Sequence, residues 1–266
     1  MPVDDICTFK ENIIYAHFQT FPDKEGYQHP YAVSWAIDDS EVDMFEGKDT
    51  LDNFMNMLNE LDKKKKFTLV FFGGSRLDIY FLYKWLVNND VKVSKINSNG
   101  AFKKIMWRNI VTWDLSLHVG AKLDKACESF GVEINGKFDQ EKIKSWSDVK
   151  KLRKEWLPFL KLEVVSMREL YLKYVVQMWE TYQLNATNSL TAPSQSFKNW
   201  RTTLSEDADI QLLTYQQDCY CRKSVYGGRC YPVKQYFISK DLNENNQVDP
   251  SVPTLEQVMT SRTSER

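Results

Sequence analysis

Hydrophobic and polar positions alternate with the period of a strand at the start of the chain. Residues 12–21 (NIIYAHFQTF) alternate and are rich in β-forming side chains, which predicts a strand. Residues 31–37 (YAVSWAI) predict a second strand, and the stretch from Pro22 to Pro30 holds the residues of a turn. The two strands are therefore expected to pair as a hairpin.

The next segments alternate between helical and strand patterns. Leu51 to Leu61 has apolar residues at helical spacing, and residues 67–72 (FTLVFF) form a short apolar run typical of a buried strand. A helix is predicted after Gly73-Gly74, where the sequence reads DIYFLYKWLVNN. Two more strands are expected within residues 91–114, and residues 121–131 predict a helix that Gly131 ends.

A long amphipathic helix is predicted over residues 163–184, and the polar stretch from Asn185 to Gln195 interrupts the pattern. We place a domain boundary there. Residues 1–185 are then expected to form an α/β domain, a mixed sheet flanked by helices. Residues 186–266 are expected to hold a helix up to residue 221, strand character beyond it and a loose C-terminal tail.

Composition excludes several classes of protein. Hydrophobic residues make up 42% and charged residues 27%, which is typical of a globular chain, and a net charge of -1 excludes a uniformly basic nucleic-acid-binding protein. No apolar run is long enough for a membrane span and the N-terminus has no signal-peptide pattern, so we expect an intracellular protein without membrane contact. The cysteines at 219, 221 and 230 fit either a zinc site or plain thiols, and the missing fourth ligand favours thiols.

Five segments, in their order along the chain, carry a family resemblance. IIYAHFQTF resembles the first exonuclease motif (D-x-E) of family B DNA polymerases, FFGGSRLDIYFL the second (H-N-x-x-x-F-D), and YLKYVVQMW the third (Y-x3-D). LTAPSQSFKNWRTTL resembles the connecting helix, and KSVYGGR the Y-x-G-G-R signature of protein-primed members. The resemblance implies a ribonuclease H-like 3′–5′ exonuclease domain followed by a linker and the start of a polymerase palm.

Most catalytic positions of the family hold other residues in this chain. The resemblance places the first motif's carboxylates on His17 and Gln19, and the third motif's Asp on Val175. Asp78 of the second motif and Tyr171 of the third are kept, as vestigial catalytic residues. The family reaction uses two Mg²⁺ ions about 4 Å apart, which need several anionic oxygen ligands. One carboxylate cannot hold both ions, so we expect no intact metal site and no Mg²⁺ cofactor.

Structural roles compete with catalytic ones at the remaining positions. His17 fits a hydrogen-bonded structural histidine better than a metal ligand, and Tyr171 fits core packing. Asp78 fits a helix cap as well as it fits a remnant of the site. Asp114 matches a family segment that contacts single strands, but Leu115 stands where the family has serine, which weakens such a role for Ser116.

The segment from Cys219 to Lys240 has five basic residues and no acidic one. Glycines let a backbone approach a phosphate, and basic side chains neutralise it. The segment therefore predicts a contact with single-stranded or primed DNA, and the competing interpretation is a solvated basic hairpin. The candidate contacts are Arg222, Lys223, Tyr226, Gly227, Gly228 and Arg229.

The family's first polymerase motif falls near Asp249, a weak metal candidate, but the residues after it do not match. The later polymerase motifs have no counterpart up to Arg266. The resemblance implies a DNA-directed DNA polymerase, a nucleotidyltransferase that binds DNA and nucleotides in replication, with a terminal protein or the rest of the polymerase as partners. We expect this chain to be an inactive fragment of one. Two alternatives are a domesticated interaction scaffold and a nuclease with unusual ligands.

Overall fold

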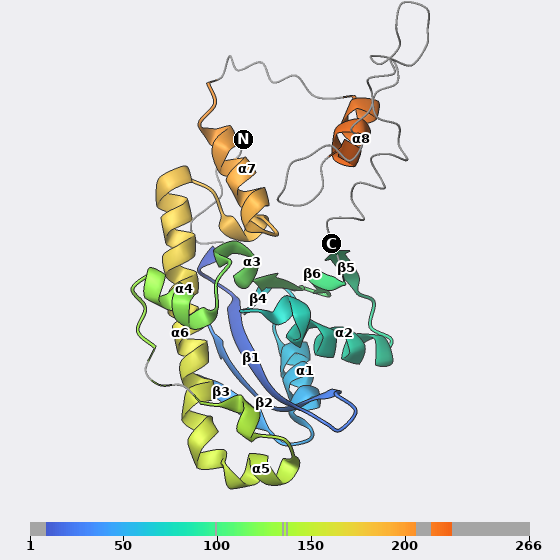
Figure 1. Cartoon of the computed structure of the whole chain (residues 1–266), viewed down its shortest axis with the longest axis vertical. Coiled ribbons are helices and arrows are strands. Elements are labelled where there is room, and N and C mark those ends of the chain that lie inside the picture. The colour runs from blue at the N-terminus through green and yellow to red at the C-terminus, as the bar shows by residue number, and fades with distance from the viewer. Residues whose placement is uncertain (1–8, 99, 135, 137, 206–213, 225–266) are drawn as a thin grey trace, which may run out of the picture. The chain divides into compact units, whose positions relative to one another are not determined.

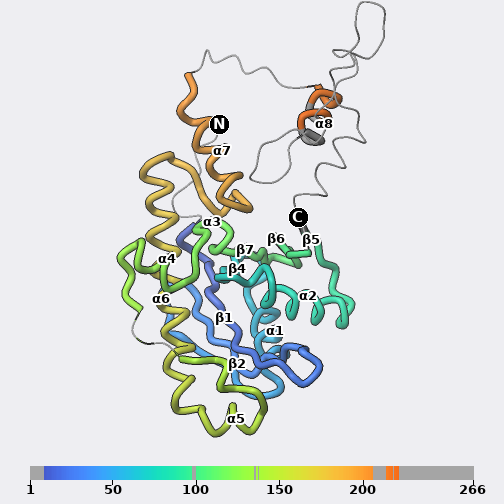
Figure 2. Tube along the Cα trace, in the orientation of Figure 1, coloured from blue at the N-terminus to red at the C-terminus, as the bar shows by residue number. Residues whose placement is uncertain are grey.

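The computed structural model describes residues 9–98, 100–134, 136, 138–205 and 214–224 (Figures 1 and 2). Residues up to Leu204 form one compact unit, and a second unit starts at Ser205. The first unit thus continues past the expected boundary at residue 185, because the helix that follows this point packs against it. In the second unit the structure describes one helix, α8 (Tyr215–Ser224).

The core of the first unit is a mixed sheet of seven strands in the order β3-β2-β1-β4-β7-β6-β5. β1 pairs with β4 and β4 with β7 in parallel, and the other pairs are antiparallel. The α/β prediction is confirmed. The strands are β1 (Ile13–Pro22), β2 (Gln28–Ile37), β3 (Asp43–Glu46), β4 (Phe67–Phe71), β5 (Ser94–Ser98), β6 (Ala101–Trp107) and β7 (Ile110–Asp114).

Helices cover both faces of the sheet (Figure 1). α6 packs on β1 and β2, and α1 and α2 pack on the opposite face. The helices of this unit are α1 (Thr50–Glu60), α2 (Asp78–Asn88), α3 (Ser116–Val119), α4 (Leu123–Ser129), α5 (Trp146–Lys151), α6 (Arg153–Tyr182) and α7 (Ala192–Thr202), with short 3-10 turns η2 (Gly74–Arg76), η3 (Gln140–Lys142) and η4 (Ala186–Asn188).

The alternation along β1 assigns its side chains to the two faces. Ile13 and Tyr15 lie in the core cluster under α6, whereas Ile14, Ala16 and Phe18 lie in the cluster under α1 and α2. Because side chains alternate along a strand, His17 and Gln19 continue the α6 face. No helix in the described part of the chain is long and apolar enough to cross a membrane.

Candidate functional site

The candidate site lies where β1 passes under the first half of α6. The Gln19 side-chain amide donates a hydrogen bond from Nε2 to Oε2 of Glu163, at 2.8 Å. His17 Nε2 lies 3.4 Å from the same oxygen. The pairing of β1 with β2 shifts register directly after Gln19, and such bulges re-aim side chains at functional sites. The strand therefore presents two neutral or cationic groups to one carboxylate.

Glu163 is the site residue that the sequence analysis missed. It lies on α6 between Leu160 and Val164, which are both buried, and its own side chain is 33% exposed. One carboxylate oxygen already receives both contacts from β1, so Glu163 holds β1 and α6 together at this point. Its position four residues after Phe159 repeats the spacing of the third motif, with Phe in place of Tyr and Glu in place of Asp.

Asp78 reaches the site from the first turn of α2. The N-cap position of this helix belongs to Leu77, so the capping role considered for Asp78 is wrong. The side chain is 4% exposed. Burial raises the pKa of Asp78 to about 7, His17 opposes this increase, and Asp114 and Glu163 add to it. The protonated form of this carboxyl is therefore present at neutral pH.

A carboxylate also organises the turn that precedes Asp78. Asp114, at the end of β7, accepts hydrogen bonds from the backbone amides of Gly73 (2.9 Å) and Ser75 (2.7 Å). It also accepts from the amide and the hydroxyl of Ser116, at 2.9 and 2.7 Å. Asp114 is thus fully occupied within the fold, and Ser116 binds it rather than pointing to a ligand.

The glycine pair of this turn is required by its geometry. Gly73 has φ +80°, in the left-handed region that favours glycine. A Cβ on Gly74 would come within 2.5 Å of Cβ of Phe71. These glycines stand where the family has His and Asn. A side chain at Gly74 would clash with Phe71, and one at Gly73 would strain the backbone.

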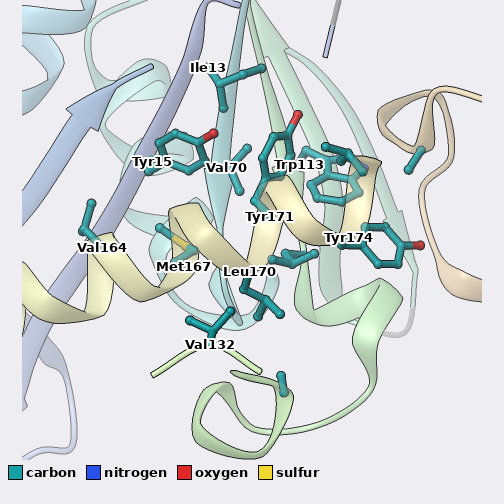
Figure 3. Packing of buried hydrophobic residues seen from close by; sticks show 14 of the residues in the cluster. Ile13, Tyr15, Val70, Trp113, Val132, Val164, Met167, Leu170, Tyr171 and Tyr174 are labelled. Carbon is teal, nitrogen blue, oxygen red and sulfur yellow. The ribbon is translucent and has the colours of Figure 1, made fainter. Parts of the chain in front are cut away.

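Val175, where the resemblance places the third motif's Asp, was expected to meet His17, Gln19 and Asp78, but it lies far along α6 from Glu163. Val175 lies 12 residues after Glu163 on one helix, which is about 18 Å at 1.5 Å per residue. Val175 and Tyr171 are fully buried in the cluster that contains Ile13 and Trp113. Figure 3 shows Tyr171 beside Trp113 in this cluster. The Tyr171 hydroxyl donates to the Phe9 carbonyl at 2.8 Å, so this residue has the structural role that was considered for it.

The converging set is therefore His17, Gln19, Asp78 and Glu163, and it does not fit a pair of Mg²⁺ ions. The set contains two carboxylates instead of four: Asp78, whose pKa is raised by burial, and Glu163, which is bonded to protein donors. Among the described residues, no group of three or more His, Cys, Asp or Glu side chains has an arrangement that could hold a metal ion. Hard divalent cations need more anionic oxygen than this.

A pocket of about 770 Å³ opens beside the site. Gln19, Glu163 and Phe159 are among its lining residues, and Phe138 stacks on Phe159 with ring centroids 6.2 Å apart. Gly136 also lines the pocket, and a Cβ there would meet the Phe159 ring at 2.4 Å. The aromatic wall could stack against a flat ring, and the polar side carries hydrogen-bonding groups.

The DNA contacts predicted in the C-terminal segment lie at the last residues that the structure describes, or beyond them. Arg222 and Lys223 belong to the last turn of α8, and their side chains are outside the described residues. Also outside them lie Tyr226, Gly227, Gly228, Arg229, Cys230 and Asp249. The roles assigned to these residues stay predictions.

Comparison with known proteins supports the family resemblance. The sequence pattern of the family described as DNA polymerase type B, organellar and viral, matches residues 137–243. A probable DNA polymerase of Agaricus bitorquis is 26% identical over 182 residues, 67% of this chain but 21% of its own length. This chain therefore spans about a fifth of that relative.

Solved structures with a similar fold are also polymerases. Phi29 DNA polymerase, solved as a complex with primer-template DNA and incoming nucleotides, aligns with a TM-score of 0.64 at 18% identity, over 82% of this chain and 39% of its own. The family B polymerase of the archaeon Pyrobaculum calidifontis aligns with a TM-score of 0.51 at 12% identity, over 76% of this chain and 31% of its own. The fold of this chain is thus similar to part of each of these polymerases.

Proposed function

We propose that this chain, which resembles the protein-primed family B DNA polymerases in sequence and in fold, is an exonuclease-like DNA-binding module that does not hydrolyse DNA. Its role would be to hold single-stranded or primed DNA during replication. Because the chain spans only part of its relatives, DNA synthesis is proposed as the process it serves, with a terminal protein or further polymerase sequence as partners. No Mg²⁺ is proposed as its cofactor.

The hydrogen bonding of Glu163 is the main support for the proposal that this chain does not hydrolyse DNA. Where a strand, a turn and a helix converge, the residues present form a protein-to-protein network, with Gln19 and His17 both bound to one oxygen of Glu163. A two-metal mechanism needs that oxygen, and several more, to face cations. Asp78 adds less than one full negative charge at neutral pH.

We expect no 3′–5′ nuclease activity with Mg²⁺ or Mn²⁺ in the unmodified protein. The double variant His17→Asp with Gln19→Glu adds two carboxylates beside Asp78 and Glu163, and we expect it to gain measurable Mn²⁺-dependent cleavage. Release of the 3′ nucleotide from a labelled single strand measures this. Val175→Asp is the control, since it buries a charge in the core about 18 Å away and should unfold the protein without restoring activity.

Activity in the unmodified protein that disappears in Asp78→Asn would contradict the proposal. It would favour the alternative of a nuclease with His17 among its ligands.

Binding of DNA is tested separately, through the basic C-terminal segment. We expect weak binding of single-stranded DNA with a strong salt dependence, because phosphate contacts release counterions. Replacing Arg222, Lys223 and Arg229 together by alanine should lower the log-log salt slope by about 2. Fluorescence anisotropy over a salt series measures it, with Lys63, Lys64 and Lys65 changed to alanine as the charge-matched control. Unchanged binding in the first triple variant would favour a solvated basic hairpin and the interaction scaffold.

A further inference from the structure

A second pocket lies on the α6 face of the sheet, at the other end of β1 from the candidate site. It has a volume of about 540 Å³, and its lining includes Asn12, Lys66, Thr68, Lys104 and Val111. We call it the lysine pocket. Six residues of strand separate Ile13 from Gln19, about 20 Å at the rise of a β-strand, so the two pockets are distinct.

The lysine pocket lies on the α6 face of the sheet, next to Trp113, which packs against α6. Val70 and Trp113 face the cluster under α6, so Thr68 and Val111, two residues before each, share that face. Lys104 precedes Ile105, which is buried on the opposite face, and therefore projects to the same face as Thr68 and Val111. α6 contacts β1 and β2 most extensively, and it also packs on Trp113 of β7 through Tyr171 and Tyr174. Thr187 and Asn188 of η4 are part of the pocket lining.

Lys66 and Lys104 line this pocket, and Lys198 on α7 lies near enough to Lys104 to act on its charge. Burial lowers the pKa of Lys104, and the charge of Lys198 on α7 lowers it further. The Lys198 ammonium donates to the backbone carbonyl of Asn188 at 2.7 Å, and within the described part of the chain neither lysine forms an ion pair. Glu11 is the one carboxylate among the described residues of the lining.

Two half-buried ammonium groups repel each other, and a bound anion would remove that cost. Lysine is a point-charge ligand for phosphate, and Thr68 and Asn12 add neutral polar groups beside it. A volume of about 540 Å³ accommodates a nucleotide-sized ligand. We propose that the lysine pocket binds a phosphate group, carried either by a free nucleotide or by a single strand of nucleic acid.

That the phosphate belongs to a single strand of nucleic acid rests on the proposed function. Two exposed aromatic residues of α7 favour this ligand. Phe197 and Trp200 flank Lys198, are 58% and 46% exposed, and place their ring centroids 5.6 Å apart. Exposed aromatic faces next to basic side chains are typical of surfaces on which successive bases stack. One strand could thus place a phosphate at Lys104 and Lys198 and a base on this pair.

The test uses a double variant that carries both Lys104→Gln and Lys198→Gln. The control is a double variant that carries Lys84→Gln and Lys154→Gln, at two exposed lysines elsewhere in the chain. Calorimetry with pyrophosphate and with dATP tests the free-nucleotide source, and anisotropy of a labelled oligothymidine tests the strand. We expect the lysine-pocket variant to bind at least about five-fold more weakly than the unmodified protein and to lose about 1 to 2 units of salt slope. The control should bind unchanged. The variant should keep its melting temperature, because removing the repulsion costs no stability.

The outcomes separate this proposal from the proposed function. Pyrophosphate and dATP binding that depends on Lys104 and Lys198, without oligothymidine binding, would support the phosphate site and overturn DNA binding. Oligothymidine binding that is equal in the variant, without binding of either small anion, would overturn the lysine pocket and leave the DNA-binding proposal standing. An unmodified protein that binds none of the three probes would overturn both.

Discussion

Replacing Asp114 by alanine should lower the free energy of unfolding by about 3–5 kcal/mol, because it leaves several buried donors without an acceptor. The carboxylate is 1% exposed and accepts four hydrogen bonds, from Gly73, Ser75 and Ser116. These bonds fix the turn that leads into α2 and so place Asp78. We expect the melting temperature to fall by about 10–15 °C in thermal unfolding followed by circular dichroism.

Two variants calibrate this result. Asp114→Asn keeps one acceptor oxygen and should lose only part of the stability, while Asp39→Ala removes an exposed carboxylate and should change the melting temperature little. A loss in Asp114→Ala no larger than the loss in Asp39→Ala would show that the turn does not depend on this carboxylate.

Replacing Asp78 by asparagine should stabilise the protein above neutral pH. The pKa of this carboxyl is about 7 in the folded protein, mainly through burial, against an ordinary value of 3.8. Between these two values the folded state holds a proton that the unfolded state has released, so stability falls as pH rises from about 4 to about 7. A rise of about three units in the pKa of Asp78 lowers the free energy of unfolding by at most about 4 kcal/mol at pH 8.

The variant removes this cost and keeps an oxygen that can accept the hydrogen bond from the Phe18 amide. Chemical unfolding at pH 8 should show Asp78→Asn to be the more stable protein, and at pH 4 the difference should vanish, because the carboxyl is then protonated in the folded state. A variant less stable at pH 8 than the unmodified protein would mean that the attraction of His17 for a charged Asp78 outweighs the cost of burial.

Local patterns predicted most of the elements that carry the site. The alternation over residues 12–21 predicted β1, and the apolar run followed by two glycines predicted β4, the turn and α2. Two strands were expected within residues 91–114, whereas the structure has three there, β5, β6 and β7, because Arg108 at φ 49° turns the chain between β6 and β7. Nothing in the periodicity marks a single residue in this conformation.

The third element of the site was misplaced for a physical reason. A helix was predicted from residue 163, but α6 begins at Arg153 and is 30 residues long, so it extends over the whole length of β1. Along such a helix, two candidate positions 12 residues apart lie at opposite ends of the strand. Tyr171 matches the family's tyrosine in sequence, yet in the structure its ring packs against Tyr15 and Trp113 rather than beside Gln19.

One signal in the sequence could have corrected this. Glu163 is an acidic residue inside the apolar stripe formed by Leu160, Val164 and Met167, and an acid on a buried face needs a partner. Gln19 and His17 are the polar residues on the facing strand, and they are the partners that the structure gives to Glu163. The pairing itself depends on tertiary packing, which no local pattern contains.

Titration of the protein with MnCl₂ in a calorimeter tests the central claim, that this site cannot hold a pair of divalent cations. We predict no saturable binding below about 1 mM in the unmodified protein, and Mn²⁺ binding in the variant that carries both His17→Asp and Gln19→Glu. Two Mn²⁺ ions bound per unmodified chain, with the binding lost in Asp78→Asn, would contradict the claim.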